Sequence, residues 1–204
     1  ISGSTLAEYC NKEISEPLKM QSTFFTPSEN KFIVPTEYDN TWRKRLLKGE
    51  VHDESASLMG GISGNAGLFS TPRNLYSLVR SLLNNGKYYN PYSRGLKEES
   101  LFKEETVNLF TSKFSTIDYD NTRALGWDTK QKPIGKYRSA CGELISENCF
   151  GHTGYTGTSI WCDKDRKIII IFLTNRVYPS RENNGIREIR PELHNKIIEI
   201  LTNK

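Results

Sequence analysis

The feature that most constrains the fold of this 204-residue chain is an apolar run near its C-terminal end. Four consecutive isoleucines, Ile168 to Ile171, are followed by Phe172 and Leu173. β-Branched residues favour strands, and so short a run cannot span a bilayer as a helix. A strand with one exposed face alternates apolar with polar residues, so this unbroken run predicts a strand covered on both faces, as in the middle of a sheet.

The residues before this run predict its pairing partner. Thr158–Cys162 has the composition of a strand, and Asp163–Arg166 supplies a polar turn before the second strand, Lys167–Thr174. The spacing therefore predicts an antiparallel hairpin. A final helix is expected from near Pro191, because apolar residues then recur at helical spacing. Those apolar residues are Leu193, Ile197, Ile200 and Leu201.

Capping signals predict helices upstream of the hairpin. Thr5 and Glu8 fit a capping box, and Thr71 is a plausible N-cap with Pro72 at the first helical position and Gly86 at the C-terminal stop. The predicted helices span residues 5–17, 71–86 and about 100–110. Helices and strands are thus segregated along the chain, which predicts an α+β fold with helices packed on an antiparallel sheet.

Charge composition argues against a nucleic-acid partner. The chain has 28 Lys and Arg against 24 Asp and Glu, and the formal net charge of +4 is spread along its length. One basic cluster stands out, and we interpret it as a solvated face rather than a phosphate site. Its members are Arg43, Lys44, Arg45 and Lys48.

The cysteines and histidines do not predict a metal site. Four cysteines lack C-x-x-C spacing and the three histidines lie far apart, so we expect neither a metal nor a cofactor. Cys141 and Cys149 flank a loop-like stretch. Two alternatives stay open for this pair: free half-buried thiols, or a disulfide in an oxidising compartment.

The segment 150–158 is the best candidate for chemistry. It places His152 and Thr153 between glycines, and glycines weaken a strand unless another backbone or a ligand must come close. One interpretation is an imidazole and a hydroxyl on an open sheet edge. The other is a glycine-rich strand that carries a buried histidine with its hydrogen bonds satisfied.

A resemblance to a known family favours the first interpretation. The order of the His152–Gly154 triplet, the hairpin and Leu173–Arg176 resembles the C-terminal half of the serine beta-lactamase-like superfamily. That superfamily includes class C beta-lactamases, penicillin-binding proteins, D-aminopeptidases and esterases. Gly60–Ile62 and Gly67–Pro72 resemble the Gly-rich entry into a helix of that superfamily. Three further stretches look most like a serine-hydrolase module found alone, or fused to a beta-N-acetylglucosaminidase, in Bacteroidetes-type bacteria. Those stretches are Val51–Ala56, Leu125–Asp128 and Asn175–Pro179.

The resemblance implies roles for the residues of this triplet. The family transfers an acyl group to a serine, and then to water. His152 would supply positive or hydrogen-bonding character near the nucleophile, and Thr153 would offer its hydroxyl to the substrate. Gly154 would allow close approach, and the backbone N–H of Tyr155 would be one of two oxyanion donors.

The family's Ser-x-x-Lys and Tyr-x-Asn or Tyr-x-Asp motifs precede the region that this sequence resembles. We interpret the short matches within the chain as chance patterns. They are Ser28–Lys31, Ser100–Lys103, Tyr38–Asn40 and Tyr119–Asn121. Residues 1–204 are therefore predicted to be a single partial domain that lacks the N-terminal strands and is inactive alone. The alternative is a non-catalytic remnant that binds a ligand or partner.

Further expectations concern single residues and partners. His52 is either paired with Asp53 near the substrate groove or part of an exposed loop, and Arg176 either holds a carboxylate or anchors the chain. His194 is expected on the surface. The expected partners are a small-molecule or peptide substrate, the missing N-terminal part of the same protein, and further copies of the chain through an exposed sheet edge. The resemblance implies a periplasmic or cell-envelope location.

Overall fold

The computed structural model describes residues 2–27, 32–89, 98–114, 122–133, 135 and 138–202. The helices are α1 (Leu6–Cys10), continued by the π-helical segment η1 (Asn11–Ser15), α2 (Glu54–Leu58), α3 (Pro72–Leu83), α4 (Glu104–Thr111) and α5 (Ile186–Thr202). The strands are β1 (Phe24–Phe25), β2 (Leu68–Phe69), β3 (Lys87–Tyr89), β4 (Glu98–Ser100), β5 (Cys149–Thr153), β6 (Ser159–Asp163) and β7 (Ile168–Phe172). The short matches Ser28–Lys31 and Tyr119–Asn121 lie outside the described residues.

The predicted hairpin is confirmed. β6 and β7 pair antiparallel with Trp161 opposite Ile170, and β5 pairs antiparallel with β6 on its other side. The three strands form one sheet in the order β5-β6-β7, and two short antiparallel pairs, β1-β2 and β3-β4, lie apart from it. Helices packed on antiparallel strands give the expected α+β fold.

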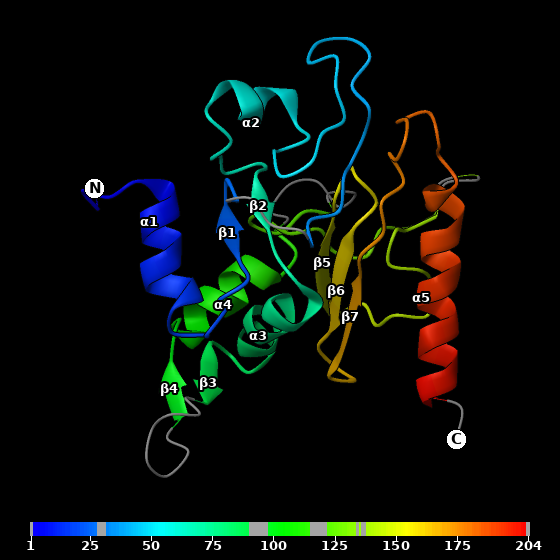
Figure 1. Ribbon diagram of the computed structural model, residues 1–204. Coiled ribbons are helices and arrows are strands. Elements are labelled where there is room, and N and C mark those ends of the chain that lie inside the picture. The colour runs from blue at the N-terminus through cyan, green and yellow to red at the C-terminus, as the bar shows by residue number, and fades with distance from the viewer. Residues whose placement is uncertain are drawn as a thin grey trace.

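One face of the main sheet packs against α3 and α4. Phe150 and Cys162 form a buried cluster with Val79 and Leu82 of α3 and Val107 of α4. Figure 1 shows α3 and α4 on one side of the three strands and α5 on the other. Alternation along a strand sends neighbouring side chains to opposite faces, so each strand contributes to both layers.

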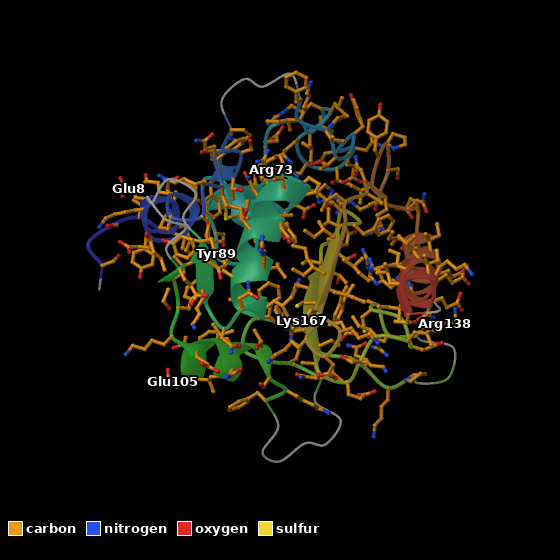
Figure 2. All side chains as sticks on the ribbon, turned by 90° about the horizontal axis from the view of Figure 1, so that it is seen from below. Glu8, Arg73, Tyr89, Glu105, Arg138 and Lys167 are labelled. Atoms are coloured by element: carbon orange, nitrogen blue, oxygen red, sulfur yellow. The ribbon has the colours of Figure 1, made fainter. Side chains whose placement is uncertain are left out.

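The opposite face of the sheet packs against α5 and the loop before β5. Trp161 and Cys149 form a second buried cluster with Cys141 and Ile145. The rings of Phe172 and His194 meet edge to face at 6.5 Å. Arg138 lies beside α5 and pairs with a carboxylate of that helix, on the far side of the molecule from Glu8 (Figure 2).

The isoleucine strand is covered on both faces, but it does not lie in the middle of the described sheet. β7 is an edge strand there, because β6 is its pairing partner among the described residues. Ile169 faces the α3 cluster, whereas Phe172 faces α5. Two helical layers, rather than a flanking strand, explain its apolar character.

Two predicted helix starts need correction. α5 begins at Ile186, with Pro191 inside the helix, because the turn at Asn184 and Gly185 supplies its first carbonyl acceptors. α4 begins at Glu104 rather than near Ser100, which instead pairs with Lys87 at the end of a short strand.

The other capping predictions are confirmed. Thr5 and Glu8 form the capping box of α1. In α3, the Thr71 side chain accepts from the Asn74 N–H, and Pro72 occupies the first turn. Past its end, the N–H of Gly86, at a φ of +88°, donates to the Ser81 carbonyl at 2.8 Å. A positive φ at this place favours glycine.

His194 is not on the surface. Its side chain is fully buried between α5 and the sheet, and its ring Nδ1 donates to the Ala140 carbonyl at 3.0 Å. Burial lowers the pKa of His194 to about 4, so the ring is neutral at pH 7. The apolar face of a helix can include a neutral histidine, and spacing alone did not identify this one.

The cysteines are free thiols. Cys141, Cys149 and Cys162 are buried, and Cys10 is half-buried. Burial raises the pKa of Cys162 to about 12, which keeps this thiol protonated. Within the described residues, no group of side chains has the composition of a metal site. Among those residues there is also no helix with the length and hydropathy to cross a membrane.

Candidate functional site

The candidate site begins at the open end of β5. The backbone of Gly151 exchanges two hydrogen bonds with Asp128, of 2.7 and 2.9 Å, so the outer edge of the strand is covered at this point. Two residues further on, Thr153 ends the strand, and the N–H of Gly154 turns inward to the Thr158 carbonyl at 2.7 Å. Among the described residues, nothing accepts a hydrogen bond from the N–H of Tyr155.

The His-Thr-Gly triplet lies at this open end. His152 is exposed, and its ring Nδ1 donates to the carbonyl of Thr153 at 2.9 Å. Thr153 is half-buried and is opposite Ser159 in the register. The second interpretation of the sequence, a buried histidine in a glycine strand, is therefore wrong for His152, because this ring is in contact with solvent.

Atoms of the neighbouring strand and turn explain why two of these positions are glycine. A Cβ at Gly151 would lie 2.3 Å from the Ile160 carbonyl oxygen and 2.4 Å from the indole of Trp161, both on the opposite strand. A Cβ at Gly154 would lie 2.2 Å from the Thr158 hydroxyl. Close contacts within the chain itself, and not only the approach of a ligand, therefore require glycine at these two positions.

Tyr155 is the centre of a set of stacking contacts. Its ring stacks on the imidazole of His52, with centroids 5.5 Å apart and planes 27° apart. The guanidinium of Arg176 lies 4.3 Å from the same ring centroid, and its Nε donates to the Tyr155 carbonyl at 2.7 Å. The fold thus brings together three of the predicted site residues from distant parts of the sequence.

His52 is buried, and its partner is not Asp53. Its Nε2 lies 2.7 Å from a carboxylate oxygen of Glu37. Asp53 instead caps α2 and accepts from the N–H of Ala56 at 2.7 Å. The sequence neighbours His52 and Asp53 have different partners, because Asp53 is the N-cap of α2, which starts at Glu54.

An arginine fixes the Glu37 carboxylate. Arg181 donates to it through Nε at 2.9 Å, through Nη2 at 2.7 Å and through its backbone N–H at 3.1 Å. The hydrogen bonds from Arg181 and His52 lower the pKa of Glu37 to about 2, so the carboxylate is ionised at pH 7. Arg181 also reaches Glu54 at 2.8 Å, and both carboxylates raise the pKa of Arg181.

A second buried ion pair holds the backbone beside His52. The Arg43 side chain, 5% exposed, pairs with Asp39 and donates to the carbonyls of Val51 and His52, each at 2.7 Å. Backbone N–H groups of Trp42 and Arg43 lower the pKa of Asp39. Arg43 therefore does not belong to a solvated face, unlike Arg45, which remains exposed.

Arg176 anchors the chain. Besides the Tyr155 carbonyl, its guanidinium donates to the carbonyls of Arg181 and Asn183 at 3.0 and 2.8 Å. Of the two roles that the sequence left open for Arg176, these contacts support the one in which it anchors the chain. They also hold the segment after β7 against the residues that follow β5.

Comparison with known proteins decides the family. The sequence model described as Beta-lactamase matches residues 1–193. The chain belongs to the Beta-lactamase family. Its similarity to two curated proteins extends over most of its length. A protein of Bacillus subtilis named "N-acetylmuramyl-L-alanine amidase" is 34% identical over 92% of this chain and 44% of its own length. An Escherichia coli protein named "Putative D-alanyl-D-alanine carboxypeptidase" is 32% identical over 86% of this chain and 41% of its own length.

Solved structures show the Beta-lactamase-family fold. A beta-lactamase from Mycobacterium bovis superposes with a TM-score of 0.59 at 18% identity, covering 98% of this chain and 58% of that protein. Simvastatin synthase from Aspergillus terreus gives a TM-score of 0.65 at 14% identity, covering 100% and 52%. The chain spans less than half the length of the two curated relatives.

In this member of the Beta-lactamase family, the sequence did not identify Glu37 or Arg181 as residues of the candidate site. Glu37 lies in a polar stretch without periodicity, and Arg181 follows Pro179 in an irregular segment. The two residues are 144 positions apart, so no local spacing connects them. Only the burial of His52 in the structure points to Glu37, because a buried histidine requires a polar partner.

Proposed function

We propose that this chain contributes the edge-strand side of the active site of a serine hydrolase, which cleaves an amide or ester by acyl transfer. The observation that carries the proposal is the unpaired N–H of Tyr155 directly after the His-Thr-Gly triplet. A backbone donor of this kind is suited to a developing oxyanion, because its peptide is held in place before the reaction.

The proposed mechanism assigns one task to each residue of the open edge. A serine Oγ gives its proton to the Lys or Tyr of the upstream motifs and attacks the substrate carbonyl carbon, and the N–H of Tyr155 stabilises the resulting oxyanion. Collapse breaks the bond to the amine or alcohol, which leaves with that proton. Water then attacks the acyl-enzyme, and its proton returns to the serine as the acid is released. The Thr153 hydroxyl hydrogen-bonds the substrate, and the exposed His152 ring, whose Nδ1 donates to the Thr153 carbonyl, presents its Nε2 as a hydrogen-bonding atom beside it.

The serine of this proposal comes from a Ser-x-x-Lys motif outside the 204 residues. The resemblance to the family implies that this motif lies upstream of the region matched here. Ser100, the one described member of the short serine matches, lies at the end of β4 rather than at the start of a helix. Its hydroxyl donates to the Phe102 carbonyl at 2.8 Å.

An amide in a peptidoglycan-type peptide is the proposed substrate. The names of both curated relatives describe hydrolysis of an amide bond, by an amidase and by a carboxypeptidase. The ring of Tyr155 is exposed and Thr153 is half-buried, so the site is open. An open site suits an extended peptide better than an enclosed pocket would.

The test is an acylation experiment on two proteins. The 204-residue chain alone and the longer protein that includes the serine motif are each mixed with a penicillin-type probe and an activated ester. We expect a stoichiometric burst and a mapped serine adduct only in the longer protein. An adduct on Ser100 of the short chain would contradict the assignment. Absence of acylation in both proteins would favour a ligand-binding remnant.

A further inference from the structure

We propose that Glu37 and His52 form a positioning device that holds the peptide of Tyr155 in one orientation. The device rests on the proposed function only for the role of the Tyr155 N–H as an oxyanion donor. The contacts that build it stand independently of any activity.

Tyr155 needs a support of this kind because it lies beyond the strand. Ladder hydrogen bonds hold β5 up to Thr153, and the bond from Gly154 to Thr158 is the last of this pattern. Tyr155 is 58% exposed, so burial alone does not fix its side chain. Its ring and carbonyl are held instead by His52 and Arg176.

His52 can act as a support because its own ring is immobilised. The side chain is 7% exposed, and its Nε2 donates to the ionised carboxylate of Glu37 at 2.7 Å. Rotation of the imidazole would break this charge-assisted hydrogen bond, which is stronger than a neutral one. Arg43 holds the adjoining carbonyl of His52, so both the backbone and the ring are fixed.

The Glu37 carboxylate is fixed in turn by the fork of Arg181. Two guanidinium nitrogens and one backbone N–H of Arg181 donate to it, which leaves the carboxylate with a single geometry. Arg176 donates to the carbonyl of Arg181, so the two arginines that reach Tyr155 and Glu37 are linked. Tyr155 is therefore held by His52 and by Arg176, and both of these residues are connected to Arg181.

Backbone dynamics of the 204-residue chain test the device without any activity. The order parameter of the Tyr155 N–H is measured by nitrogen-15 relaxation in the parent, His52→Ala, His52→Phe and Tyr76→Ala. We expect about 0.85 in the parent and in His52→Phe, which keeps a ring to stack on, and below about 0.6 in His52→Ala. Tyr76 is the matched control, because it is an exposed tyrosine that contacts an arginine, Arg80, but no histidine.

The outcomes separate the device from the proposed function. An unchanged order parameter in His52→Ala, or the same loss in Tyr76→Ala, would overturn the device. Glu37→Ala gives a second check, and we expect it to lower the order parameter as His52→Ala does. In the longer, serine-containing protein, His52→Ala should lower kcat by about ten- to a hundredfold, with KM changed less than about threefold. Normal kinetics with a mobile Tyr155 would refute the oxyanion role while leaving the device intact.

Discussion

Replacement of Glu37 by glutamine should destabilise the protein in a pH-dependent way. The Glu37→Gln side chain has nearly the same shape, but it cannot carry the charge that Arg181 and His52 contact. The pKa of Glu37 falls from 4.5 to about 2, which corresponds to at most about 3 kcal/mol of folding free energy. The Arg181 side chain is 32% exposed, so solvent screens part of this interaction. We expect a loss of roughly 1–2 kcal/mol at pH 7.

The sign of the pH dependence follows from the lowered pKa. A carboxylate with a lowered pKa stabilises the fold fully above its unfolded pKa, and this contribution is lost as the pH falls toward the folded value. The difference between parent and Glu37→Gln should therefore be constant from pH 7 to about pH 5. It should shrink between pH 4.5 and about pH 2, the interval between the unfolded and folded pKa values.

Urea unfolding, followed by circular dichroism at a series of pH values from 7 to 3, measures this difference. Glu199→Gln is the matched control, because Glu199 pairs with Lys196 on an exposed helix face and should cost no more than about 0.5 kcal/mol. The reasoning is refuted if Glu37→Gln is as stable as the parent at pH 7. It is also refuted if the difference between the two proteins is the same at pH 3 as at pH 7.

Three further predictions concern the sheet. Gly151→Ala should cost about 3 kcal/mol in urea unfolding, because its Cβ would lie 2.4 Å from the Trp161 ring; a cost below about 1 kcal/mol would contradict this packing. In the longer, serine-containing protein, Thr153→Val should lower kcat/KM by about ten- to a hundredfold with circular dichroism unchanged, and parental kinetics would count against the site. The 204-residue chain should associate through the edge of β7, so its sedimentation coefficient should rise with concentration; a monomer at every concentration tested would disprove the association.

Local patterns in the sequence predicted much of the fold. The hairpin of β6 and β7 followed from strand composition on both sides of a polar turn, and α3 followed from Thr71, Pro72 and Gly86. These features depend on backbone preferences and hydrogen bonds within a few residues. Such preferences act wherever the segment lies in the molecule, which is why they can be identified before the fold is known.

The position of the triplet at an open strand end was also predictable, but only through the resemblance to a known family. The residues by themselves left two interpretations of His152 open, exposed or buried. The end of the strand decided between them, because β5 is buried from Cys149 to Gly151, where Asp128 pairs with it, and becomes exposed at His152.

The tertiary structure alone decided which polar groups meet. Glu37, His52 and Arg181 come from three segments without a shared period, and the sequence paired His52 with its neighbour Asp53 instead. The burial of His194, likewise, depends on Phe172 and Ala140 from other segments. A helix cap is specified by neighbours along the chain, whereas the partner of a buried charge is whichever complementary group folding brings within hydrogen-bond distance.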